Sequence, residues 1–178
     1  DGIRDVAVTG VQTWLFRSEQ ARNAADRGSD IHAALESWYE GVMIADRVEY
    51  QIGVSDAVRD WCGDHNWSVE KSFGYVKSGK GFGGKVDLHT RDGDGIVIDF
   101  KTKEFTDPDK VEGYDEHVMQ LAAYRNGLEL PKARCANVFV SSIEPGLVLI
   151  KEWNENELVR GWEMFDALKA YYYAKSKL

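Results

Sequence analysis

Three residues near the middle of the chain have the types and spacing that could hold a metal ion beside a phosphate. Asp87 lies in the run GKVDLHTR, and Asp99 and Lys101 lie in IVIDFKTK. Both runs are β-prone, and residues two apart share a strand face. A carboxylate in an apolar strand is costly unless it is paired or binds a metal. Two hard oxygen ligands suit Mg²⁺ or Mn²⁺, and an adjacent lysine can stabilise charge developing on a phosphate.

The turn between these two runs sets how closely the three side chains approach. β-rich segments on both sides of Asp92-Gly93-Asp94-Gly95 predict a hairpin. A three-residue loop, Asp92–Asp94, places Asp87 directly opposite Asp99, and a two-residue loop displaces it by about one position. Either register brings two carboxylates and one ammonium together. The spacing alone is equally compatible with a salt-bridged hairpin face exposed to solvent.

The preceding stretch GKGFGGKVD, residues 79–87, superficially resembles a nucleotide-binding loop. Its glycines fit G-x-G-x-x-G, and Gly79, Gly84 and Lys85 nearly fit G-x-x-x-x-G-K-[ST]. Both motifs require a helix after the loop, whereas a β-prone segment follows here. Val86 also occupies the Ser/Thr position of the second motif. We therefore interpret the glycines as the flexible entry to a strand.

These residues require a sheet with helices to position them. The pattern predicts an α/β (α+β) domain with a mixed sheet flanked by helices. Ser29 is expected to cap the second helix, and Asn154 with Glu157 to form a capping box for the last. Expected helices span about 12–27, 29–42, 46–64, 109–128 and 154 to the end, and expected strands span 67–77, 84–91, 96–103, 134–141 and 146–152.

Bulk properties narrow the class of protein. With 178 residues we expect one domain, 1–178, with a helical part of about 1–65 and a sheet-bearing part of about 66–178. No apolar run approaches the roughly 20 residues that span a bilayer, so no membrane partner is expected. Two distant cysteines offer no disulfide framework and favour a reducing, cytoplasmic location. The formal net charge of −8 excludes a uniformly basic coat but permits a local basic track.

The hairpin motifs together resemble a known nuclease family. GGKVDL, with Asp87, is similar to a G-x-x-D strand, and IDFKTK, with Asp99 and Lys101, is similar to a D-[FY]-K-T strand. D-(x)n-[DE]-x-K across a hairpin is the core of the PD-(D/E)XK nuclease superfamily, and the chain resembles its RecB-like branch. The resemblance covers roughly residues 27–128 and implies a restriction-endonuclease-like core.

Further segments carry the same resemblance, in the expected order. RGSDIHAALE is similar to the G-[ST]-x-x-H helix and gives His32, and QLAAY is similar to the Q-x-x-x-Y helix and gives Gln120 and Tyr124. WSVEKSF supplies Glu70, an acidic residue at the head of the first core strand. From the residues alone, His32 could equally be a surface or capping histidine, Gln120 and Tyr124 a half-buried helix stripe, and Glu70 a solvated strand end.

The resemblance implies a site and a reaction. The metal, one or two ions of Mg²⁺ or Mn²⁺, would be held by His32, Asp87, Asp99 and the backbone carbonyl of Phe100. Lys101 and the metal would activate water for in-line attack on a phosphodiester, leaving a 5′-phosphate. The expected activity is that of a DNA exonuclease acting on ends or single strands. The alternatives are a structure-selective endonuclease or nickase on the same fold, and a nucleic-acid-binding module without turnover.

A basic stretch adjoins the expected site. Residues 71–86 contain no acidic side chain, and aromatic residues alternate with the lysines, which suits a surface that tracks and stacks on single-stranded DNA. A solvated hairpin explains the lysines about as well. The candidate DNA contacts are Lys71, Lys77, Lys80, Lys85, Gln120 and Tyr124, with Phe73, Tyr75 and Phe82 as stacking residues.

Two features separate the chain from larger members of the family it resembles. Cys62 and Cys135 cannot supply the four cysteines of the iron–sulfur cluster that some RecB-like nucleases carry, so no such cluster is expected. There is also no helicase segment. The expectation is a stand-alone core like the phage or organellar exonucleases that process DNA ends.

Overall fold

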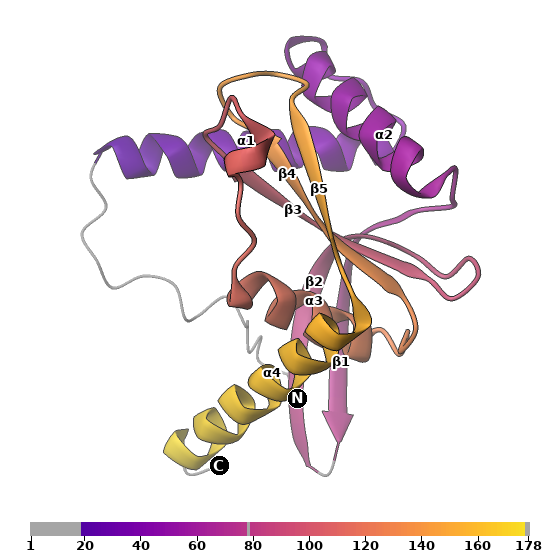
Figure 1. The fold of residues 1–178 in the computed structure, drawn as a ribbon, viewed down its shortest axis with the longest axis vertical. Helices are drawn as coiled ribbons and strands as arrows, with labels where there is room; N and C mark the ends of the chain where they lie inside the picture. The colour runs from indigo at the N-terminus through magenta and orange to yellow at the C-terminus, as the bar shows by residue number, and fades with distance from the viewer. Residues whose placement is uncertain (1–18, 78, 177–178) are drawn as a thin grey trace, which may run out of the picture.

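A twisted five-stranded sheet forms the centre of the molecule (Figure 1). The computed structural model describes residues 19–77 and 79–176. The strands lie in the sheet in chain order, and they are β1 (Ser68–Lys77), β2 (Lys80–Thr90), β3 (Ile96–Lys103), β4 (Arg134–Ser141) and β5 (Val148–Trp153). Neighbours are antiparallel except β3 and β4, which are parallel. The mixed sheet agrees with the predicted fold class.

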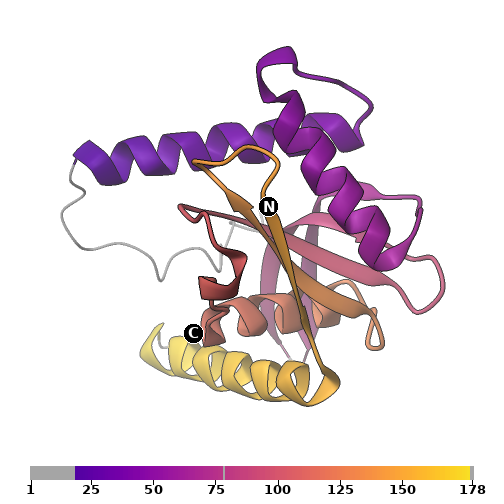
Figure 2. The ribbon, with the colours of Figure 1, turned by 45° about the horizontal axis from the view of Figure 1, so that its top comes forward.

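Helices cover both faces of this sheet, α1 and α2 on one and α3 and α4 on the other (Figure 2). The helices are α1 (Glu19–Tyr39), α2 (Val48–Cys62), α3 (Asp115–Gly127) and α4 (Glu155–Ser176), with short 3₁₀ turns at Ala45–Arg47 and Pro108–Lys110. None of the helices in the described ranges is both long and apolar enough to cross a membrane. The architecture is a three-layered α+β fold consistent with a restriction-endonuclease-like core.

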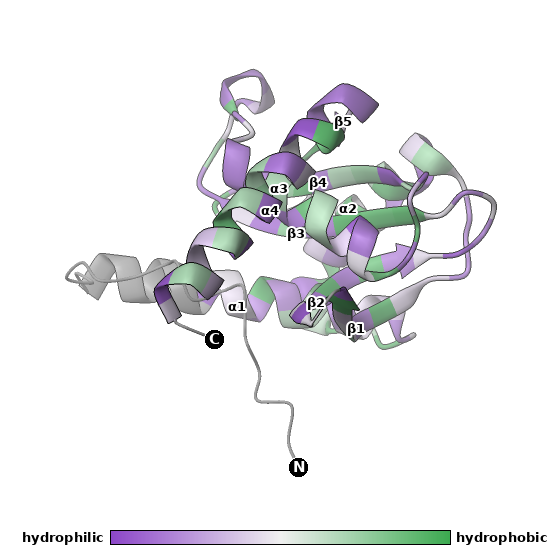
Figure 3. Ribbon diagram, turned by 90° about the horizontal axis from the view of Figure 1, so that it is seen from below, coloured by the Kyte–Doolittle hydropathy of each residue, from purple (hydrophilic) through white to green (hydrophobic). Residues whose placement is uncertain are grey.

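The central strand β3 is buried from Ile96 to Phe100 because helices cover it from both sides. Green, apolar segments accordingly lie along the central strands in Figure 3. The β3–α3–β4 segment is the crossover that the parallel pairing requires. It places α3 directly beside the strand that carries Asp99 and Lys101.

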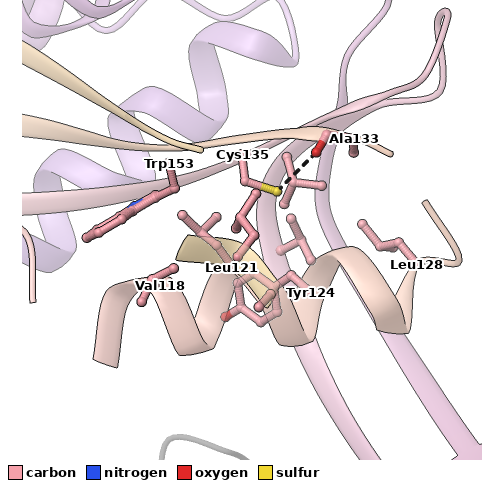
Figure 4. Packing of buried hydrophobic residues seen from close by; sticks show 11 residues of the cluster. Val118, Leu121, Tyr124, Leu128, Ala133, Cys135 and Trp153 are labelled. Carbon is pink, nitrogen blue, oxygen red and sulfur yellow. Dashed lines mark hydrogen bonds between the residues drawn. The ribbon is translucent and has the colours of Figure 1, made fainter. Parts of the chain in front are cut away.

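Two apolar cores hold the layers together. One lies beneath α1 and α2, and its buried members are Ile31, Leu35, Val54, Val58, Leu88, Ile96, Ile98, Phe100, Val138 and Val140. The other lies beneath α3 and α4 (Figure 4), and its buried members are Val86, Val97, Val118, Leu121, Ala122, Tyr124, Leu128, Ala133, Cys135, Trp153 and Leu158. Asp87, Asp99 and Lys101 come from strands held between these two cores.

The N-terminal helix differs from the prediction. α1 runs unbroken through Gly28 and Ser29, so Ser29 does not cap a separate helix. One glycine in a helix costs only about 1 kcal/mol, and burial of Ile31 and Leu35 against the sheet outweighs that cost. The part of the predicted helix before residue 19 lies outside the described residues. The expected break at Gly41 is present, with φ of 88°.

The ends of the other helices follow local signals to different degrees. α3 begins at Asp115 and not near 109, because Pro108 starts only a 3₁₀ turn and Val111 continues in extended conformation. The capping box of α4 is confirmed. The backbone N–H of Glu157 donates to Asn154 Oδ1 at 3.0 Å, and the backbone N–H of Asn154 donates to Glu157 Oε2 at 2.8 Å.

Candidate active site

Asp87 and Asp99 lie opposite each other on β2 and β3. The pairs Leu88–Ile98 and Thr90–Ile96 fix the register, and its continuation sets Asp87 against Asp99. This is the register predicted for a three-residue loop. The paired part of the ladder ends at Leu88, and the amide of Phe100 donates instead to Asp87 Oδ2 at 2.7 Å. The strands thus separate at the point where the carboxylates lie.

Asp99 is almost fully buried, with 3% of its surface exposed, and one of its oxygens accepts two donors. Lys101 Nζ lies 2.5 Å from Asp99 Oδ2, and Asn137 Nδ2 donates to the same oxygen at 2.8 Å. Asn137 comes from β4, where the parallel register pairs it with Asp99. Sequence reasoning missed Asn137, although a lone amide in the apolar run RCANVFVS was the available signal.

Lys101 is held from the other side by helix α3. Its ammonium donates to Gln120 Oε1 at 2.9 Å, and Gln120 Nε2 donates to the Tyr124 hydroxyl at 2.7 Å. An ammonium has no acceptor, so the Gln120 amide can take only this orientation between the two groups. Burial, and secondarily the charge of Asp99, raises the pKa of Tyr124, so its hydroxyl keeps a proton to donate. Two consecutive hydrogen bonds therefore connect Lys101 to Gln120 and Gln120 to Tyr124.

The two carboxylates share more negative charge than their surroundings neutralise. Burial, and then the charge of Asp99, raises the pKa of Asp87 from 3.8 to about 7. The Phe100 amide and the charges of Lys101 and Lys85 act in the opposite direction but do not cancel the effect. A pair of this kind takes up a proton or another cation near neutral pH.

His32, on α1, points toward the same carboxylates. Its Nδ1 lies 4.0 Å from Asp87 Oδ2, and its ring meets the Phe100 ring edge to face at 6.2 Å. Burial lowers the pKa of His32, and Lys101 adds to this effect while Asp99 opposes it. The imidazole is consequently neutral at pH 7, which is the form that binds metals.

The chemistry of the donor set fits a divalent cation, although the present side-chain arrangement does not enclose one. Among the described residues, no group of three or more His, Cys, Asp or Glu side chains is arranged to hold a metal ion. The described hydrogen bonds to the Asp87 and Asp99 carboxylates end on Oδ2, as do the ion-pair contacts of His32 and Lys101. Two buried carboxylates, one with a strongly raised pKa, are hard ligands that a cation would stabilise.

Glu70 lies at the edge of this arrangement. The β1–β2 register sets it opposite Asp87, between the pairs Val69–Leu88 and Lys71–Val86. Its φ of 50° is rare for a residue with a side chain and interrupts the ladder there. The Glu70 carboxylate forms an ion pair with Lys85. Glu70 is thus near the carboxylate pair, but its described ion pair is with Lys85.

The ribbon formed by residues 71–86 of β1 and β2, here called the arm, presents its lysines unevenly. Lys71 and Lys77 are exposed, Lys80 lies over the Tyr173 ring at 5.7 Å, and Lys85 pairs with Glu70. The two most available cations on the arm are therefore Lys71 and Lys77.

The expected aromatic stacking surface on the arm is wrong for Phe82. Phe82 is only 7% exposed and packs with Ala123 and Phe165, against which Phe73 and Tyr75 also pack. These rings face α3 and α4 because the arm needs an apolar face to be held against the helices. Phe82 is therefore part of the fold and not free to stack on bases, whereas Phe73 and Tyr75 are only half-buried.

Comparison with known proteins supports the fold. No protein-family model and no curated protein sequence matches the chain. A crystal structure of the protein SSO0001 is 22% identical over 80% of this chain and 72% of that chain, with a TM-score of 0.41. A protein from Eubacterium rectale named "Putative exonuclease" is 13% identical over 86% of this chain and 66% of that chain, with a TM-score of 0.52. The chain shares its fold with the Eubacterium rectale protein.

Proposed function

We propose that the protein is a divalent-metal-dependent DNA exonuclease of the RecB-like branch of the PD-(D/E)XK superfamily. The observation that carries the proposal is the juxtaposition of Asp87, Asp99 and Lys101 at the point where β2 and β3 separate. The motif resemblance and the name of the Eubacterium rectale protein point to the same class of reaction. The intact set of three residues argues against a binding module that has lost turnover.

In this proposal the cation is Mg²⁺ or Mn²⁺, held by Asp87, Asp99, the His32 imidazole and the Phe100 carbonyl. A cation bound there would supply positive charge that balances the two carboxylates and polarises the scissile phosphodiester. The raised pKa of Asp87 supports the assignment, because the site holds negative charge that its protein neighbours leave partly uncompensated.

Lys101 has the central role among the protein's own groups. Its ammonium, held between Asp99 and Gln120, is a fixed donor that orients the attacking water and stabilises negative charge growing on the phosphate oxygens. Because the partners of Lys101 are already in place, little reorganisation is needed during the reaction. The water oxygen would form a bond to phosphorus as the P–O3′ bond in line with it breaks. The water would lose a proton to solvent and the leaving 3′-oxygen would take one from solvent, which gives a 5′-phosphate and a 3′-hydroxyl. Tyr124 is only 7% exposed, so in this proposal it does not reach the DNA and instead holds the Gln120 amide, from which its hydroxyl accepts a hydrogen bond.

The proposed substrate is a DNA end or a single strand. A net charge of −8 disfavours tight binding along an uninterrupted duplex, while Lys71 and Lys77 offer local positive charge on the arm. An extended single strand following the arm would reach the carboxylate pair, because β2 carries both Lys80 and Asp87.

The test is a cleavage assay on end-labelled linear and circular DNA, single- and double-stranded, with Mn²⁺ and with chelator. Asp99→Ala and Lys101→Ala should each reduce cleavage at least about 100-fold, with circular dichroism spectra like that of the wild type. Lys110→Ala, which removes an exposed lysine whose described ion pair is with Asp107, is the matched control and should retain activity. Undiminished cleavage by either site variant would refute the assignment of the active site.

The same assay separates the alternatives. Cleavage of circular DNA would replace the exonuclease with an endonuclease or nickase on the same fold. DNA binding without cleavage, with both Mg²⁺ and Mn²⁺, would replace it with a non-catalytic module. Processive shortening of linear substrates alone would support the proposal.

A further inference from the structure

Two consecutive buried hydrogen bonds connect Asp99 to Trp153 through Asn137. Trp153 Nε1 donates to Asn137 Oδ1 at 2.8 Å, and Asn137 Nδ2 donates to Asp99 Oδ2 at 2.8 Å. Asn137 has no exposed surface, and Trp153 is 6% exposed. Buried side-chain amides normally bond to backbone groups, whereas the amide of Asn137, on β4, connects side chains of the two strands that flank it, β3 and β5. The connection leads directly to a candidate catalytic carboxylate.

The chemistry of the three groups fixes the direction of every hydrogen bond. An indole nitrogen can only donate, so Asn137 must turn its oxygen toward Trp153. The amide nitrogen of Asn137 is then the group left for Asp99, and it too can only donate. Asp99 Oδ2 must therefore be the acceptor. An isolated asparagine could flip its amide, but one held by Trp153 cannot do so without losing both hydrogen bonds.

Trp153 is itself held firmly. Gly113 lies so close to the indole that a β-carbon there would approach Trp153 Cζ2 to 2.8 Å, and Lys151 Nζ lies 4.9 Å from the ring centroid on its face. Trp153 also belongs to the core beneath α3, where it lies near Val118 (Figure 4). The donor at the start of the chain of hydrogen bonds is thus fixed by packing.

We propose that Asn137 and Trp153 are positioning residues for Asp99, an inference that rests on the proposed nuclease function. Together with Lys101, they keep Oδ2 of Asp99 saturated with donors, so that Oδ1 is the oxygen presented to a divalent cation. Neither residue touches substrate. Their contribution is to hold one carboxylate in a single orientation, which strengthens cation binding and turnover.

The test compares Trp153→Phe with Trp162→Phe. The first variant keeps an aromatic ring in the core but removes the indole N–H. The second makes the same change at a partly buried tryptophan that packs on Phe82 and Phe165 and has no hydrogen bond to Asn137 among the described residues. Mn²⁺ binding without DNA is measured by calorimetry, and kcat and KM are measured on a labelled single strand.

The expected result is specific to one variant. Trp153→Phe should weaken Mn²⁺ binding about 10-fold and lower kcat by a similar factor, with KM for DNA changed less than about twofold. Trp162→Phe should bind Mn²⁺ like the wild type. Wild-type Mn²⁺ affinity and kcat in a folded Trp153→Phe protein would overturn the proposal, and so would equal losses in both variants, which would indicate a general packing effect.

A measurement on the wild type covers the case in which Trp153→Phe does not fold. Titration with Mg²⁺ should shift the indole ¹H–¹⁵N resonance of Trp153 and leave that of Trp162 unmoved, and no shift at Trp153 would overturn the inference. The outcomes also separate the two proposals. A wild type that binds Mn²⁺ through the Trp153-dependent site but cleaves no DNA would refute the nuclease function and leave the positioning role standing.

Discussion

Replacing Asp87 by asparagine should raise the free energy of unfolding at pH 8 when divalent cations are absent. Asp87 lies beside Asp99 in a largely buried site, with 17% of its side chain exposed, and these surroundings penalise its charged form. Asparagine has nearly the same shape, and its oxygen can still accept the Phe100 amide hydrogen. The substitution therefore removes the repulsion while keeping the hydrogen bond.

The raised pKa of Asp87 sets the magnitude and the pH window. The pKa is 3.8 in an ordinary setting and about 7 in the fold. Between these values the unfolded chain has lost the proton while the folded chain keeps it, so stability falls as pH rises through this range. Above pH 7 the penalty is complete. A difference of about three pKa units corresponds to at most about 4 kcal/mol, and partial exposure reduces the expected gain to about 2–4 kcal/mol.

Urea unfolding of the wild type and Asp87→Asn in chelator, at pH 8 and pH 5, measures this effect. The gain at pH 5 should be less than half of that at pH 8. Asp94→Asn, at an exposed position in the loop between β2 and β3, makes the same charge change and should alter stability by less than about 0.5 kcal/mol. If Asp87→Asn gives no gain in the free energy of unfolding at pH 8, or an equal gain at both pH values, the charge on Asp87 does not destabilise the fold as proposed.

Three other predictions concern packing, DNA contact and the histidine. Gly161→Ala should lower the free energy of unfolding by about 1–3 kcal/mol, because the new β-carbon would lie 2.8 Å from a backbone oxygen of α3. Gly28→Ala should raise the free energy of unfolding by up to about 1 kcal/mol, because the nearest atom to its β-carbon would be 3.8 Å away. Equal effects of the two substitutions in thermal unfolding would contradict this prediction. Lys77→Ala should reduce the slope of log affinity against log salt concentration for single-stranded DNA by about 0.7, and Lys110→Ala should leave this slope unchanged. If Lys77→Ala also leaves the slope unchanged, Lys77 does not contact the DNA. His32→Ala should weaken Mn²⁺ binding about 10-fold, and an unaltered calorimetric titration would exclude His32 as a ligand.

The hairpin was predictable because it depends on local signals. The D-G-D-G turn and the β-prone runs beside it predicted two possible registers, and the structure has the one that sets Asp87 against Asp99. The capping box at Asn154 was predictable for the same reason, since both partners lie within four residues. Lys101 followed from the period of the strand once the register was known.

Features that depend on tertiary packing were harder to predict. The role of Asn137 depends on a parallel pairing between strands separated by a whole helix, and its partner Trp153 comes from a third strand. Ser29 has the local signature of a cap, but the apolar side of α1 continues the helix past it. Phe82 alternates with lysines in the sequence, yet its ring packs against Ala123 of α3 and Phe165 of α4 and is not exposed to solvent.

The most direct test of the central claim is the turnover of linear single-stranded DNA by wild type and Lys101→Gln with Mn²⁺. Glutamine retains a hydrogen-bond donor but removes the positive charge held between Asp99 and Gln120. We expect metal-dependent release of 5′-phosphorylated products by the wild type and a loss of at least about 100-fold in kcat for the variant. A variant that turns over like the wild type, or a wild type that releases no product with either metal, would contradict it.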